Sequence, residues 1–435
     1  MTVNKFPFIL LSAGVVFVAA SFAWCADVPA QPAIGIPLVD APLSLDFALK
    51  LALETNPGLR AASGRVEAAL GRASQARVWA NPELEFGAED WPLRGSRGYS
   101  SSKRTIGITQ ALPFPGKKSL DKKIGGAGVK LSEAELSVCR TELVREVKIA
   151  FFRVLAFERL AEESLQLLVV AESSAVIARK RVEAGAAAYP EQLRAEVQVE
   201  QARSELGDLQ RELVAARRSF ATLLGRPDLS SAKLSGVLEE KPDAELIEGT
   251  ATECLAGHPS LSAAQASLDQ AELGRRRALL ELYPDVKVSV AGGRVGETGQ
   301  SIGQLSFSVP LPIMDRGRGV QQEAKANVNV AIAELHAVQQ RLQRDRGGAV
   351  KAYRTAIEQV SSYRERILPK AGEALRLVQA GFEQGKFTFM DLIDTQRTTA
   401  EVRMAYLEKL LEMNVAQAEL EALTVEEKLF VRSKK

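Results

Sequence analysis

The sequence predicts a mostly α-helical protein with a small β part, built from two copies of one structural unit. Three observations support this fold class. The 435-residue chain has few aromatic residues (6%) and many aliphatic, alanine and long polar side chains, which lose little rotamer freedom on a helix. Several motifs recur about 200 residues further along the chain. Short stretches of alternating apolar and polar residues interrupt the helical periodicity.

The composition argues against several classes of protein. The 56 lysines and arginines and the 54 aspartates and glutamates leave a net charge of +2, so no strong positive field favours nucleic acid as a partner. With 2 histidines, 3 cysteines and no close spacing among them, we expect no metal site and no cofactor. The sequence also contains no nucleophile–base cluster and no phosphate-binding glycine loop. We therefore expect a protein that is not an enzyme.

The N-terminus, residues 1–25, is predicted to be a secretory signal peptide. Lys5 is followed by an uncharged apolar run that ends at Trp24, and a proline-containing stretch predicted to be extended, 26–42, comes next. An uncleaved anchor helix is the weaker alternative, because the run is near the lower length limit for spanning a membrane. Cys25 raises the question of a lipoprotein signal, although Trp24 is large for the position before a lipidated cysteine.

The duplication divides the rest of the chain into a first repeat, 43–225, a linker, 226–243, a second repeat, 244–430, and a tail, 431–435. Paired motifs in the same order carry it: Asn56–Ala62 with His258–Ala264, Asn81–Phe86 with Tyr283–Val288, Leu112–Pro115 with Val309–Pro312, and Glu183–Gly185 with Glu383–Gly385. Coincidence is an unlikely source of four matches in one order.

Each repeat is predicted to contain a helix, a β-hairpin and a long helical hairpin. The strands are expected at about 82–92 and 103–112 in the first repeat, and at about 284–291 and 303–310 in the second. A Pro-x-Pro motif ends each strand pair because proline cannot continue a ladder. The helical hairpins are expected at about 131–224 and 322–430, with turns at Gly185 and Gly385.

The predicted strands have one apolar and one polar face. In a soluble sheet the polar face would meet water and the apolar face would pack on helices. Strands of about 10 residues with this alternation also match a transmembrane β-barrel, because lipid requires an apolar outer face and an aqueous lumen requires a polar inner face. Four strands cannot close such a barrel alone, so the chain is expected to oligomerise. The polar side chains expected to line the lumen are Glu83, Glu85, Glu89 and Lys287.

Over essentially the whole mature chain, the sequence resembles the TolC-like outer-membrane efflux proteins (outer membrane factors), and most of all their CzcC/CusC-like heavy-metal efflux branch. The duplicated layout and four segments carry the resemblance: Leu43–Pro57, Ile108–Lys117, Phe307–Gly317 and Gly381–Gln396. It implies an outer-membrane homotrimer with a 12-stranded barrel in lipid and an α-helical periplasmic tunnel. It also implies two protein partners, a periplasmic adaptor (membrane fusion) protein and an inner-membrane pump of the resistance-nodulation-division (RND) type.

The resemblance implies a gate at the periplasmic end of the tunnel. Asp391 and Asp394 lie at the matching distance after Gly385, and their i, i+3 spacing places them on one helix face, where three copies would form two acidic rings. The alternative is that both are ordinary solvated acids near a helix N-terminus. Side chains around this turn are expected to pack at the gate: Phe382, Phe387 and Lys386.

The turns themselves are where the family contacts its adaptor, which implicates Gly185, Gly385, Ala186 and Tyr189. The expected function is an outer-membrane channel of a tripartite efflux system, with metal cations as the expected substrate. Two alternatives stay open within the channel class, an exporter of organic toxins and a type I protein secretion channel. A soluble periplasmic coiled-coil protein is the alternative outside that class.

Overall fold

A computed structural model of the chain describes residues 42–90, 102–238 and 257–424, all within a compact unit that spans Ala41–Lys435. The predicted signal peptide, Cys25 and the C-terminal tail lie outside the described residues, as do the start of the second repeat and most of the first hairpin loop.

The first repeat begins with two short helices and continues into a strand pair and two long helices. Its elements are β1 (Leu43–Ser44), α1 (Leu45–Thr55), α2 (Pro57–Gln75), β2 (Glu83–Glu89), β3 (Lys103–Leu112), α3 (Lys117–Glu183) and α4 (Tyr189–Leu223). Two short elements follow within the predicted linker, the 3₁₀ helix η2 (Pro227–Ser231) and β4 (Leu234–Ser235). The linker is therefore partly structured, because β4 pairs in parallel with β1.

The second repeat has the same order of elements. They are α6 (Pro259–Leu279), the 3₁₀ helix η3 (Leu280–Leu282), β5 (Val286–Val295), β6 (Ser301–Ser308), α7 (Arg318–Ser362), the π-helical η4 (Tyr363–Ile367), α8 (Leu368–Glu383) and α9 (Phe389–Thr424). The long helix expected from residue 322 is thus not continuous. Pro369 stands in the first turn of α8 and has no N–H for the preceding turn, and the helix widens into η4 just before it.

The helices α1, α2 and α6 start at capping residues of the sequence. The hydroxyl of Ser44 accepts a hydrogen bond from the N–H of Phe47, and the side chain of Asn56 accepts one from Leu59, which starts α2 at Pro57. His258 plays the same part for α6, with its Nδ1 accepting from the N–H of Ser260 at 3.1 Å.

Glycines account for two boundaries that the sequence analysis misplaced. The first hairpin was expected to start near residue 131, but α3 starts at Lys117 and includes Gly125, where a Cβ would lie 2.9 Å from the Cα of Ala73 in α2. The third strand was expected to end near residue 291, but β5 runs to Val295 through Gly293, where a Cβ would lie 2.0 Å from the carbonyl oxygen of Arg104. In both cases glycine allows two backbones to approach closely.

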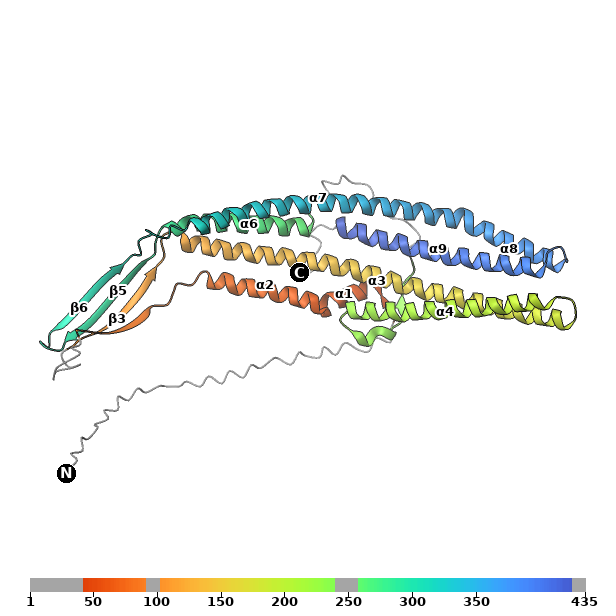
Figure 1. Cartoon of the computed structure of the whole chain (residues 1–435), viewed down its shortest axis with the longest axis horizontal. Helices are drawn as coiled ribbons and strands as arrows, with labels where there is room; N and C mark the ends of the chain where they lie inside the picture. The colour runs from red at the N-terminus through yellow and green to blue at the C-terminus, as the bar shows by residue number, and fades with distance from the viewer. Residues whose placement is uncertain (1–41, 91–101, 239–256, 425–435) are drawn as a thin grey trace, which may run out of the picture. The chain divides into compact units, whose positions relative to one another are not determined.

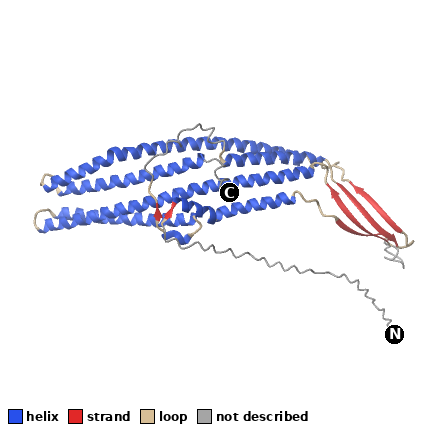
Figure 2. Ribbon diagram, turned by 180° about the vertical axis from the view of Figure 1, so that it is seen from behind, coloured by secondary structure: helices blue, strands red, loops and turns tan. Residues whose placement is uncertain are grey.

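The four long strands form one antiparallel sheet in the order β2-β3-β5-β6, drawn in red in Figure 2. The seam between the repeats is the β3–β5 pair, and β2 and β6 are the two edges. Exposed apolar side chains share one face of the sheet, since Phe86 is opposite Ile106, Ile108 is opposite Val290, and Val290 is opposite Leu305.

The helices pack side by side as two antiparallel hairpins. Figure 1 shows the α3/α4 hairpin beside the α7/α8/α9 hairpin, with the sheet at one end of this unit and both hairpin turns at the other. Helix α3 contacts α2, α4, α6 and α9, so the core runs along it, with Phe151, Val147 and Val154 fully or nearly fully buried.

None of the helices in the described part of the chain is both long and apolar enough to cross a membrane.

Candidate functional site

The two hairpin turns have the same backbone structure. At the first, Gly185 has a positive φ of 70°, and the N–H of Ala186 donates to the carbonyl of Arg181 at 2.8 Å. At the second, Gly385 has a φ of 73°, and the N–H of Lys386 donates to the carbonyl of Gly381 at 2.8 Å. Both are Schellman motifs, which need glycine at the left-handed position. The turns of the two repeats therefore differ only in their side chains.

The second turn starts α9 with a reciprocal capping box. The backbone N–H and the hydroxyl of Thr388 both donate to Oδ2 of Asp391, at 2.8 and 2.6 Å, and the N–H of Asp391 donates back to the Thr388 hydroxyl at 3.2 Å. These hydrogen bonds, first from the hydroxyl and then from the N–H, hold the pKa of Asp391 below its ordinary value of 3.8. The first turn has no such box, because Ala188 caps α4 there without a side-chain hydrogen bond.

Asp394 lies one turn further along α9 and is also exposed. Its carboxylate pairs with the guanidinium of Arg397 at 3.1 Å, and Arg397 reaches Glu401 at 3.8 Å. The two predicted gate aspartates are thus close together on α9, and each carboxylate is held by a local partner. Neither Thr388 nor Arg397 was predicted from the sequence to contact these aspartates, although each stands three residues from the aspartate that it contacts.

A buried aromatic ring joins the two hairpins just behind the turns. Phe389, the first residue of α9, is 2% exposed and forms an apolar cluster with Ile393 of the same helix and with Ala178 and Ala195 of the first hairpin. The guanidinium of Arg181 in α3 lies 5.4 Å from the centre of the Phe389 ring. From the sequence Phe389 belongs only to the tip segment expected to contact the adaptor, and its burial was not predicted, because the alanines that cover it lie on the other hairpin.

The residues expected to pack at the gate have different environments. Phe382 lies against Phe389, with ring centres 5.9 Å apart, and belongs to the border of the buried cluster. Phe387 is 44% exposed and lies over Gly381, where a Cβ would be 2.3 Å from its ring. Lys386 is exposed, as is Tyr189 at the other turn. The structure therefore joins Phe382 to the buried cluster and leaves Phe387, Lys386 and Tyr189 on the surface of the turns.

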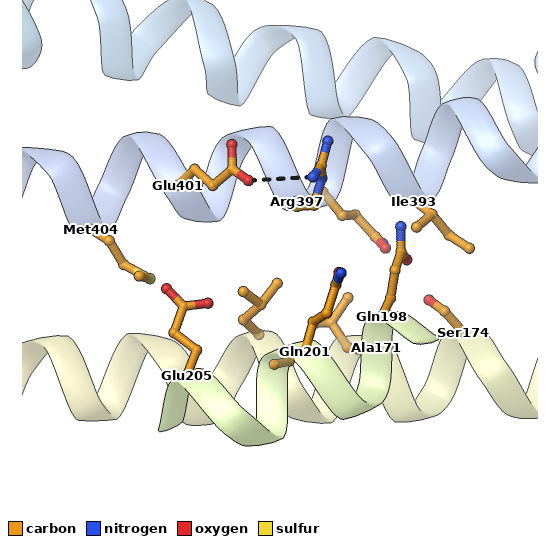
Figure 3. Close-up of a pocket in the computed structure, with 13 residues that line it drawn as sticks. Ala171, Ser174, Gln198, Gln201, Glu205, Ile393, Arg397, Glu401 and Met404 are labelled. Carbon is orange, nitrogen blue, oxygen red and sulfur yellow. Dashed lines mark ion pairs between the residues drawn. The ribbon is translucent and has the colours of Figure 1, made fainter. Parts of the chain in front are cut away.

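A pocket of about 150 Å³ lies between α3, α4 and α9, and Ile393 of the buried cluster forms part of its lining (Figure 3). Helix α3 contributes Ser174, α4 contributes Gln198 and Glu205, and α9 contributes Arg397 and Glu401. Burial, followed by repulsion from Glu401 and Glu408, raises the pKa of Glu205. Carboxylates from α4 and α9 thus approach one another here. Glu205 and Glu401 are about 200 residues apart in the sequence, so no local sequence pattern reveals that they line one pocket.

The predicted lumen residues share the polar face of the sheet. Glu83, Glu85 and Glu89 alternate along β2 with Leu84 and Phe86. Two contacts on this face were not expected from the sequence.

The first unexpected contact on the polar face is an ion pair of 2.7 Å between Lys103 and Glu89. The second is a hydrogen bond of 2.6 Å between the hydroxyls of Thr109 and Ser289. Lys287 lies opposite Ala111 and Ser308. Within the described residues, no group of three or more histidine, cysteine, aspartate or glutamate side chains could hold a metal ion.

Comparison with known proteins supplies the family. A model of the outer membrane efflux proteins matches residues 48–226 and 251–425, one match in each repeat. The chain is 30% identical to the cobalt-zinc-cadmium resistance protein CzcC of Cupriavidus metallidurans, over 92% of this chain and 94% of CzcC. It is 26% identical to the nickel-cobalt-cadmium resistance protein NccC of Alcaligenes xylosoxydans, over 72% of this chain and 69% of NccC.

The fold is similar to that of the CmeC outer membrane channel of Campylobacter jejuni. The TM-score is 0.77 at 13% identity, over 89% of this chain and 88% of that one.

Proposed function

This chain belongs to the outer membrane efflux protein family, and we propose that three copies of it form a channel through which a tripartite system exports metal cations. It is a channel component of the outer membrane, with a mostly helical, TolC-like fold that also contains a small sheet, as the sequence predicted. The number of copies, the partner proteins and the substrate belong to the proposal.

The observation that carries the proposal is the four-stranded sheet, which has one apolar face, one polar face and two unpaired edges within the described chain. Such edges cannot remain open in lipid, because each unpaired backbone group there costs several kcal/mol. Three copies of four strands supply 12, which close a barrel with the apolar face toward lipid. The helical hairpins of the same copies then continue the barrel as a tunnel into the periplasm.

In this arrangement the hairpin turns face the adaptor and the pump. Gly185, Gly385, Ala186 and Tyr189 lie on the exposed surface of the two turns, where a periplasmic adaptor protein binds. The adaptor joins the channel to an inner-membrane pump of the resistance-nodulation-division type.

Asp391 and Asp394 form the gate in this proposal. Their i, i+3 spacing on α9 gives two acidic rings when three copies meet. The capping box fixes the Asp391 carboxylate, and its hydrogen bonds from Thr388 lower the pKa of this side chain and so favour its negative charge. Two stacked rings of negative charge attract cations and repel anions.

The metal cation substrate is supported by the relatives, since the 30% identical protein is named for resistance to cobalt, zinc and cadmium. The acids around the Glu205 pocket and on the polar face of β2 are compatible with a cationic substrate. A deletion strain that loses resistance to these metals, and keeps its resistance to organic toxins, would support the assignment. The opposite pattern would favour the organic-toxin exporter, and loss of a secreted protein would favour the secretion channel.

Single-channel recording in planar bilayers tests the gate. We expect Asp391→Asn/Asp394→Asn to raise conductance and to weaken block by a trivalent cation added on the periplasmic side. The asparagine at 391 keeps an acceptor for Thr388, so the change removes charge with little loss of capping. The matched control is Asp208→Asn, because Asp208 makes the same i, i+3 pair with Arg211 on the exposed surface of α4. Equal conductance and equal block in the double variant and the control would refute the gate.

A further inference from the structure

We propose that a second copy of this chain docks at the β6 edge through an ion pair between Arg318 and the partner's Glu83, flanked by an apolar contact with the partner's Val78 and Trp79. The inference rests on the proposed trimer and adds the residues that hold it together. It comes from the duplication. One ion pair joins the two repeats within the chain, and the residues that correspond to its two partners lie at the two edges of the sheet without an ion-pair partner in the described residues.

The contact within the chain lies where β3 ends and β5 begins. Lys117 is the first residue of α3, after the positive-φ Gly116, and its Nζ donates to Oδ1 of Asp285 at 2.9 Å. The same carboxylate oxygen accepts from the N–H of Phe114 at 2.9 Å. The Phe114 ring stacks on Tyr283 with ring centres 4.6 Å apart. The Lys117 side chain is 5% exposed, so this is a nearly buried ammonium with its carboxylate partner.

Each residue of this contact has a counterpart in the other repeat. Arg318 is the first residue of α7, after the positive-φ Gly317, as Lys117 is in α3. Glu83 follows Asn81 and Pro82 as Asp285 follows Tyr283 and Pro284. Within the described residues neither Arg318 nor Glu83 forms an ion pair, and both are exposed. They lie at opposite edges of the sheet, so only another copy can bring them together.

The two edges also carry unpartnered apolar side chains at the corresponding places. Beyond β6 the second repeat has four residues, 313–316, that the first repeat lacks. Within them Ile313 is 65% exposed and Met314 is 97% exposed, and the preceding Leu311 is the counterpart of Phe114. At the other edge, Val78 and Trp79 lie before β2 and are 51% and 55% exposed. Docking would remove both groups from water.

The strand register that the duplication predicts is compatible with the alternation of apolar and polar residues on β2 and β6. If β6 pairs with the partner's β2 as β3 pairs with β5, where Leu112 is opposite Val286, then Val309 is opposite the partner's Leu84 and Phe307 opposite the partner's Phe86. Both pairs continue the apolar face of the sheet. A slip of one residue would place the partner's Phe86 opposite a serine and reverse the faces. In this register the partner's Glu83 takes the place relative to β6 that Asp285 takes relative to β3, and the proposal pairs it with Arg318, which starts α7 as Lys117 starts α3.

Charge exchange tests the ion pair. We expect Glu83→Arg and Arg318→Glu each to lower the temperature at which the detergent-purified trimer dissociates on a gel, and the double variant Glu83→Arg/Arg318→Glu to recover most of the loss. Glu85→Arg/Arg318→Glu is the matched control, because Glu85 shares the polar face but lies opposite Ser308 in the inferred register. Equal recovery by the control, or no recovery by the first pair, would overturn the inference.

A crosslink tests the geometry directly in a chain whose native cysteines are replaced by serine. Glu83→Cys/Arg318→Cys treated with a short bis-maleimide should give covalent trimers, whereas Lys117→Cys/Asp285→Cys should give a crosslinked monomer of altered mobility. Conducting trimers without the first crosslink would refute this interface and leave the proposed channel intact. Absence of trimers in the unmodified protein would refute the proposed channel and this interface with it.

Discussion

Replacing Phe389 with alanine removes the ring that joins the two helical hairpins behind their turns. The side chain is 2% exposed, in a cluster with Ile393, Ala178 and Ala195, so the cost is that of a core Phe-to-Ala change, about 3–5 kcal/mol. Loss of the Arg181 contact adds about 0.5–1 kcal/mol, the value for an accessible cation–π pair. At about 1.4 kcal/mol per factor of ten, local opening of the turn should become at least about 100-fold more frequent.

Hydrogen exchange measured by mass spectrometry on the detergent-purified channel resolves this opening by position. Peptides from the first two turns of α9 and from the last two turns of α3 should lose protection by about 100-fold or more, because α9 is no longer held against the first hairpin. Peptides from β3 and β5, at the far end of the unit, should be unchanged. Single-channel recording should show more frequent openings, since the acidic pair on α9 would move with its helix.

Two control variants make the reasoning falsifiable. Phe387→Ala removes a ring of the same size that is 44% exposed, so its effect should be much smaller. Phe389→Leu keeps most of the buried volume and should cost below about 1.5 kcal/mol. If Phe389→Ala and Phe387→Ala gave the same protection in α9, Phe389 would not be the contact that holds the hairpins together.

Three further predictions concern titration and buried charge. Hydrogen bonds from Thr388 lower the pKa of Asp391. The stabilisation that Asp391 gives to the start of α9 is therefore fully present above the ordinary pKa of 3.8 and is lost only as the pH falls through the lower pKa of the folded state. Protection of the first turn of α9 from hydrogen exchange should be equal at pH 7 and pH 5. Burial lowers the pKa of His258, so its stabilisation of α6 is present above about pH 6.5 and is lost as the pH falls through the lower pKa of the folded state. His258→Asn keeps a capping acceptor that does not titrate, so thermal denaturation of this variant should not show the loss of stability at low pH that His258 causes. Asp285→Asn should destabilise the channel by about 1–3 kcal/mol in denaturant titration, because it leaves the nearly buried ammonium of Lys117 without a carboxylate. An unchanged midpoint would contradict the role assigned to this pair.

The sequence predicts the elements of this fold well where the signal is local. Alternation of apolar and polar residues marks the strands, because the side chains of a strand point to opposite faces in turn. Glycine marks both hairpin turns, because each requires a positive φ at Gly185 and Gly385. The duplication then extends each assignment from one repeat to the other. The fold class and the family follow from these patterns, and the comparisons confirm both.

Features that depend on contacts between distant segments are absent from the sequence pattern. Gly125 counts against a helix until its close approach to Ala73 is known, so the start of α3 was placed too late. Lys117 and Asp285 are 168 positions apart, and nothing local indicates that they meet. The full burial of Phe389 cannot be predicted from α9 alone, because Ala178 of α3 and Ala195 of α4 cover the ring together with Ile393 of its own helix.

The central claim is that three copies of this chain complete one channel. Native mass spectrometry of the protein extracted from outer membranes in detergent tests it most directly. The account predicts a particle of three identical chains, and the Arg318→Glu variant should shift it toward smaller species. A particle of one chain, stable in detergent and still able to conduct ions in a planar bilayer, would contradict the account.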